Sequence, residues 1–71
     1  MQQLEFHLRG EFIELCNLLK LTGVCDSGGA GKALVAEGLV SVDGQVESRK
    51  TAKIRAGQVV TSGETQIKVR S

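Results

Sequence analysis

The chain has 71 residues, of which 41% are hydrophobic, and its formal net charge of +1 by itself indicates no particular partner. This length suits a single domain, residues 1–71, and its core must be aliphatic because Phe6 and Phe12 are the only aromatic side chains. No apolar run of about 18 residues could span a membrane and no secretion signal opens the chain, so we expect a cytoplasmic protein with reduced cysteines.

The spacing of apolar residues predicts an opening strand and a first helix. Apolar and polar residues alternate over residues 3–8, which indicates a strand. Over residues 11–22 apolar residues recur in pairs three apart, which indicates an amphipathic helix with a broad buried face. Glu11 and Glu14 suit the positive amino end of this helix, and Gly23 suits a left-handed stop after it.

A second helix should follow after a short turn. It can begin at Asp26 or Ser27, because either side chain can accept the free amide hydrogens of a first helical turn. It runs to Glu37, and Gly38 ends it. We expect its core stripe to consist of Ala30, Ala33 and Leu34.

The remainder of the chain predicts a small antiparallel sheet. Its strands are expected at residues 40–42, 46–48, 53–55, 58–62 and 65–69. Placing Val40, Val42 and Val46 on one face requires a three-residue loop over residues 43–45. The fold class is therefore α+β, with two helices packed against a small antiparallel sheet and an added N-terminal strand.

Four basic residues follow the predicted hairpin within seven positions, with no acidic residue among them: Arg49, Lys50, Lys53 and Arg55. We call residues 49–55 the basic segment. A stiff hairpin with a cationic flank can present charge to a polyanion such as a nucleic acid. The alternative interpretation is a solvated face, or a charged strand edge that prevents sheet-to-sheet aggregation. The acidic excess of residues 1–40 against the basic excess of residues 41–71 slightly favours the polyanion.

A glycine-rich stretch, residues 28–32, suggests a nucleotide site, but its spacing excludes one. A phosphate loop needs Gly and then Ser or Thr at the positions of Asp26 and Ala33. Close packing of the second helix on the first explains Gly31, which lies nearer the core side. The other two glycines fall with Lys32 on the outer face, where a phosphate could approach backbone amides. Packing and an anion site both remain open for this stretch.

The sequence offers little material for catalysis or metal binding. The single histidine, His7, has no nucleophile or carboxylate partner nearby in the sequence. Two cysteines and one histidine match no four-ligand zinc pattern. Cys16 is expected in the core, and Cys25, in the turn between the helices, is expected to be more exposed. We therefore predict no enzyme, no metal, no cofactor and no small-molecule substrate.

A longer pattern is similar to a known family. It consists of Leu15-x-x-Leu18-Leu19-x-x-x-Gly23, then Ser27, then Lys32-Ala33-Leu34-Val35-x-x-Gly38-x-Val40-x-Val42-Asp43-Gly44, and finally Gly57-Gln58-Val59-Val60. Over about residues 11–62 this spacing closely resembles the αL RNA-binding domain, named from the fourth protein of the small ribosomal subunit. The glycine pair of the second helix and Val-Glu-Ser-Arg-Lys after the hairpin look most like short stand-alone bacterial members of the YbcJ and YaaA type.

The resemblance implies an RNA-binding module. It implies recognition of structured RNA, such as ribosomal or transfer RNA, through the second helix and the adjoining hairpin. The RNA-binding residues that it implies are Lys32, Arg49, Lys50, Lys53 and Arg55. Stacking on single-stranded bases is not expected, because the chain has no Tyr or Trp and both Phe are expected to be buried.

Asp43 and Gln58 replace an Asn and an Asp of the family pattern, and three further positions lack a cation that members often have. Glu14 stands where many members place Arg or Lys, and Gly28 and Ala36 stand where ribosomal members often place Arg. The alternative function is therefore a protein-interaction module on the same fold with weakened RNA binding.

Overall fold

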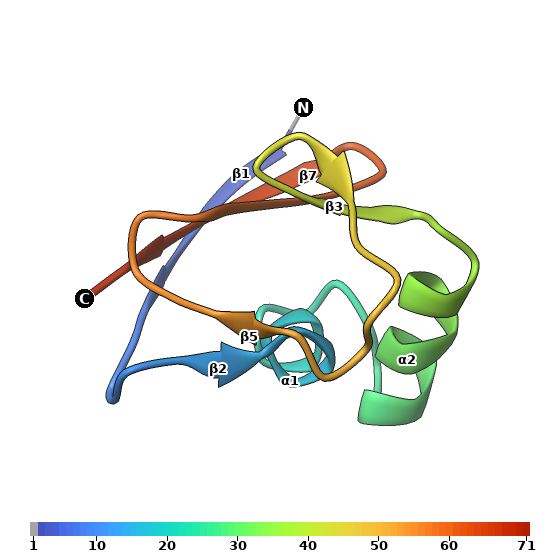
Figure 1. Ribbon diagram of the computed structural model, residues 1–71, viewed down its shortest axis with the longest axis horizontal. Helices are drawn as coiled ribbons and strands as arrows, with labels where there is room; N and C mark the ends of the chain where they lie inside the picture. Colours follow the sequence, from blue (N-terminus) through green and yellow to red (C-terminus); the bar gives the residue numbers. More distant parts are fainter. Residues whose placement is uncertain (1) are drawn as a thin grey trace.

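In the computed structural model, which describes residues 2–71, two helices lie against one face of a sheet (Figure 1). The elements in chain order are β1 (Gln2–His7), β2 (Ile13–Glu14), α1 (Leu15–Leu21), α2 (Gly28–Ala36), β3 (Val40–Val42), β4 (Gln45–Val46), β5 (Lys53–Ile54), β6 (Val59–Ser62) and β7 (Thr65–Arg70). The main sheet has the strand order β1-β7-β6-β3-β4, and β2 and β5 form a separate two-stranded sheet. The predicted α+β fold with two helices on a sheet is confirmed.

Strands β3, β4, β6 and β7 pair antiparallel as predicted, and the added N-terminal strand makes the main sheet mixed. Strand β1 pairs in parallel with β7, from Gln2 opposite Thr65 to His7 opposite Arg70. Parallel strands need a long connection, and here almost the whole chain lies between the two. This pairing joins the first and last strands of the described structure.

The core lies between the helices and one face of the main sheet. Helix α1 buries Leu15, Leu18 and Leu19 completely. The other fully buried large side chains are Val35, Val40, Ile54, Val60 and Ile67. Burying one such side chain stabilises the fold by roughly 1.5–3 kcal/mol. Within residues 2–71, the opposite face of the sheet has no helix over it (Figure 1), and no helix is long and apolar enough to cross a membrane.

Helix α1 is shorter than the predicted helix over residues 11–22. Ile13 and Glu14 are extended and pair with Ile54 and Lys53. Glu14 is the N-cap residue, but its side chain makes no capping hydrogen bond. Two amides of the first turn instead donate to the basic segment, Leu15 N to the Ala52 carbonyl (2.9 Å) and Cys16 N to the Lys50 carbonyl (3.1 Å). These carbonyls satisfy hydrogen-bond donors that a helix start leaves free, so no acidic cap is needed.

Helix α2 begins and ends as predicted, but its core face differs in part from the predicted stripe. The Ser27 hydroxyl accepts the Ala30 amide at 3.2 Å. The buried positions are Gly31 and Val35. Of the predicted stripe, Leu34 is half-buried and packs against the core, whereas Ala30 and Ala33 are exposed. The reason is Gly31: a Cβ at this position would lie 3.0 Å from the Cys16 carbonyl oxygen. The missing side chain lets α2 approach α1 closely along this face, which confirms the packing interpretation for this glycine.

The first hairpin has a two-residue turn, so the predicted three-residue loop was wrong. Ser41 pairs with Val46 and Val42 pairs with Gln45, which leaves Asp43-Gly44 as the turn. Both turn residues have positive φ, 52° and 85°, as the commonest tight hairpin turn requires. The Asp43 carboxylate accepts the Val59 amide at 2.9 Å and so holds this conformation against β6. Val46 consequently lies on the face of the main sheet that the helices do not cover, which we call the open face, and it is 65% exposed.

Candidate functional site

The basic segment is fixed to the core by its apolar residues. Ala52 and Ile54 are buried, whereas the four basic side chains are exposed. The segment also provides the two carbonyls that cap α1 and forms β5 beside β2. Its cations are therefore presented on an ordered backbone at the amino end of α1.

Lys53 and Arg55 converge on an aromatic ring that was expected in the core. Phe12 is 41% exposed, so the expectation that it is buried was wrong. The register that pairs Ile13 with Ile54 directs those two side chains inward and leaves their neighbours outward. The Lys53 ammonium lies 5.0 Å from the ring centre and the Arg55 guanidinium carbon 5.9 Å. We call Phe12, Lys53 and Arg55 the Phe12 cluster.

Arg49 is held by a carboxylate. Its Nε and Nη2 donate to the two carboxylate oxygens of Glu47 at 3.2 and 3.3 Å, and its backbone amide donates to the same group at 3.0 Å. These hydrogen bonds from Arg49 are the main reason that the pKa of Glu47 lies below its usual value, and they raise the pKa of Arg49. The sequence pattern did not predict this partner because Glu47 precedes the seven-residue window.

The backbone at Lys50 and at Gly31, the neighbour of Lys32, contacts Cys16 at the amino end of α1. The Lys50 carbonyl accepts the Cys16 amide, and Gly31, next to Lys32, packs on the Cys16 carbonyl. Among residues 2–71, no ion pair involves Lys32, Lys50, Lys53 or Arg55. The structure thus brings Lys53 and Arg55 together at Phe12 and pairs Arg49 with Glu47. In the part of the chain that it describes, it does not bring Lys32 into contact with the cations of the basic segment.

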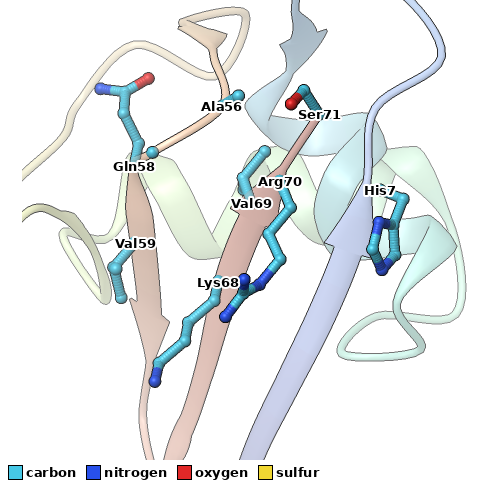
Figure 2. Close-up of a pocket in the computed structure, with 9 residues that line it drawn as sticks. His7, Ala56, Gln58, Val59, Lys68, Val69, Arg70 and Ser71 are labelled. Carbon is cyan, nitrogen blue, oxygen red and sulfur yellow. The ribbon is translucent and has the colours of Figure 1, made fainter.

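A second group of basic side chains lies on the open face of the sheet. Figure 2 shows Lys68 and Arg70 on β7 and His7 on β1, at a shallow hollow of about 540 Å³. The Arg70 guanidinium is paired with Glu5 at 2.6 Å, which lowers the positive charge available there. This group was not predicted from the sequence. The alternation of Lys68 and Arg70 with Ile67 and Val69 in the last strand could have indicated that both cations lie on one face.

The two cysteines, Cys16 and Cys25, lie in the interior. Both thiols are free and buried, so the expectation that Cys25 is more exposed was wrong. Burial raises the pKa of the Cys25 thiol, and the negative charge of Asp26 raises it further. Within residues 2–71, no group of three or more potential metal ligands comes together.

Two helices on a sheet, with an ordered basic segment at the amino end of the first helix, define a small domain of the αL type. The family model of the S4 domain matches residues 6–70. The chain is 51% identical over 57 residues to YbcJ of Escherichia coli strain K12, a protein named for proposed RNA binding, with 80% of this chain and 81% of that protein covered. YbcJ of Shigella flexneri matches to the same extent.

A solved structure also matches this chain. The solution structure of Escherichia coli YbcJ, described as revealing an αL motif involved in RNA binding, matches with a TM-score of 0.71 and 42% identity. The match covers 100% of this chain and 89% of the YbcJ chain. The chain belongs to the S4 domain family, and the resemblance found in the sequence is confirmed.

Proposed function

We propose that this protein is a non-catalytic RNA-binding protein that recognises structured RNA. The basic segment and α2 form its contact surface, with Lys32, Arg49, Lys50, Lys53 and Arg55 as the RNA-binding residues. Ribosomal and transfer RNA in the cytoplasm are the candidate partners. The observation that carries the proposal is the anchored basic segment, whose exposed cations stand on backbone that caps α1. The relatives described as RNA-binding support it.

The cations suit recognition of the RNA backbone. Double-helical RNA has a deep, narrow major groove that side chains cannot read, so proteins recognise its shape and its phosphates. Phosphate contacts position a protein without reading sequence. Lys32, Lys50, Lys53 and Arg55 have no carboxylate partner among residues 2–71 and can therefore contact phosphates without first breaking an ion pair.

The direct test is a charge reversal within the basic segment. The variant Arg49→Glu/Lys50→Glu/Lys53→Glu should lose binding to a stem-loop RNA, because three proposed phosphate contacts become repulsive. Binding is measured by fluorescence anisotropy, and the fold is checked by circular dichroism and thermal unfolding. Lys53 faces Glu14 across the β2–β5 pair, and like charges in this position destabilise a sheet. A second triple variant with Lys53→Gln removes this repulsion.

The matched control reverses one charge elsewhere. Lys20 is exposed in the last turn of α1, at the end opposite to the basic segment. Lys20→Glu should bind the stem-loop nearly as well as the wild type, whereas Lys50→Glu should not. Unchanged affinity in both triple variants would defeat the assignment.

A protein-interaction module is the second candidate function. Two exposed apolar side chains favour it: Leu39 is 54% exposed and Val46 is 65% exposed, and Val46 lies beside Gly38. A complex formed through this apolar surface should lose little affinity as salt rises. A pull-down with and without ribonuclease separates the two candidates, because a partner retained after RNA digestion favours the protein module.

A further inference from the structure

We propose that Phe12 is a stacking site for one unpaired RNA base, and that Lys53 and Arg55 bind the phosphates next to that base. The inference rests on the proposed RNA-binding function and adds a ligand class to it: a duplex that ends in, or is interrupted by, a single-stranded nucleotide. It assigns to the Phe12 cluster a role that charge alone does not imply.

The first argument is the exposure of the Phe12 ring. The other phenylalanine, Phe6, is half-buried and packs against the core cluster, as does the adjacent Ile13. Phe12 is the more exposed of the two rings, with 41% of its surface accessible. An aromatic side chain carries a large apolar surface that a fold normally buries. This ring is instead available to a ligand.

The second argument is the position of the two cations. The Lys53 ammonium and the Arg55 guanidinium carbon lie 5.0 and 5.9 Å from the ring centre, within the range of cation–π attraction. Nucleotides present a flat π face next to a negatively charged phosphate, and single-strand-binding sites combine aromatic rings with cations for this reason. Long basic side chains can move from the ring to the phosphate when a base arrives. The cluster therefore matches both parts of a nucleotide.

The third argument is that the ring is held in place. The next residue, Ile13, pairs with Ile54, and both are anchored in the interior. Phe12 therefore stands at the end of a fixed strand and adjoins the proposed phosphate-binding surface. The other exposed large apolar side chains, Leu21, Leu39 and Val46, are not aromatic and cannot stack on a base in this way.

The experiment compares two RNA hairpins with the same stem, one blunt-ended and one with a short 3′ overhang. The wild type should bind the overhang hairpin at least about 5-fold more tightly, the lower end of the effect of one aromatic stack. Phe12→Leu should remove this preference and leave the affinity for the blunt hairpin unchanged. Leu39→Ala, which also removes exposed apolar surface, should keep the preference.

A second readout uses the composition of the chain. The protein has no Trp or Tyr, so Phe12→Trp introduces the only tryptophan. A base stacked on this indole quenches its emission, so the overhang hairpin should quench it and the blunt hairpin should not. The quenching should persist for hairpins that differ only in the identity of the unpaired base, because every base has a π face.

The outcomes separate the inference from the function on which it rests. If Phe12→Leu keeps the wild-type preference, or if saturating overhang RNA leaves the tryptophan emission of the Phe12→Trp variant unchanged, the stacking site is wrong while RNA binding stands. If the wild type binds neither hairpin, both proposals fail. Thermal unfolding of each Phe12 variant excludes a loss of fold as the cause.

Discussion

Arg49 shows how one carboxylate can moderate a binding surface. Its guanidinium and backbone amide are both bound to Glu47, yet the Arg49 side chain is 78% exposed. Ion pairs at the surface contribute little to stability. A phosphate can therefore take the place of Glu47 at little cost. In the free protein, however, this cation is partly neutralised.

Removing the Glu47 charge should strengthen RNA binding. Glu47→Gln keeps an oxygen for the Arg49 backbone amide but frees the guanidinium. We expect affinity for a stem-loop to rise several-fold and the log–log salt slope to become more negative by roughly 0.7–0.9, one phosphate contact. Titrations at four salt concentrations measure both quantities, with Glu64→Gln, in the turn between β6 and β7, as the control for net charge.

The lowered pKa of Glu47 determines how the effect of Glu47→Gln on RNA affinity should depend on pH. The stability that the ion pair contributes is fully present above the ordinary carboxyl pKa and is lost as the pH falls through the lowered pKa. The difference between the wild type and Glu47→Gln should therefore be largest near neutral pH and shrink at acid pH. A difference that is constant across this range would show that the Arg49–Glu47 pair is not its cause.

At the scale of the elements, the contact between α1 and α2 depends on one glycine. A Cβ on Gly31 would lie 3.0 Å from the Cys16 carbonyl oxygen, whereas a Cβ on Gly28 would have no atom within 4 Å. The three glycines that open α2 are therefore not equivalent. Close packing accounts for Gly31 and not for Gly28.

Alanine substitutions should separate these two positions. Alanine is favoured over glycine in a helix by about 1 kcal/mol, so Gly28→Ala should stabilise the protein by up to that amount. Gly31→Ala gains the same propensity but presses a methyl group against the α1 backbone. Because overpacking of this kind costs about 1–3 kcal/mol, we expect a net destabilisation of up to about 2 kcal/mol. Thermal unfolding midpoints should therefore move in opposite directions. If Gly31→Ala unfolds at a higher temperature than the wild type, the packing account is wrong.

The elements that the sequence predicted well are those with local signals. Ser27 as a cap and Gly38 as a stop bound α2 because each acts within a few residues. The start of α1 could not be predicted in this way. Residues 12–13 continue the helical spacing of apolar side chains. Residues 13–14 are nevertheless extended, because they pair with β5, which is distant in the sequence.

At the scale of the whole molecule, the candidate site also depends on pairings between distant residues, which the sequence did not predict. The sequence located the basic segment and its family, but the exposure of Phe12 follows from the β2–β5 register, which joins residues about 40 positions apart. The parallel β1–β7 pair likewise depends on the two ends of the fold meeting. Neither pairing leaves a local signal in the chain, so the aromatic part of the site became visible only in the structure.

The proposed function depends on contacts between RNA phosphates and the exposed cations beside α1. The salt dependence of stem-loop binding is the sharpest check, since each neutralised phosphate releases counterions. With about three to five contacts, log affinity against log salt should fall with a slope of roughly −2 to −4. A slope near zero for the wild type, or an equal slope for the triple variant of Arg49, Lys50 and Lys53, would show that these cations do not bind the RNA backbone.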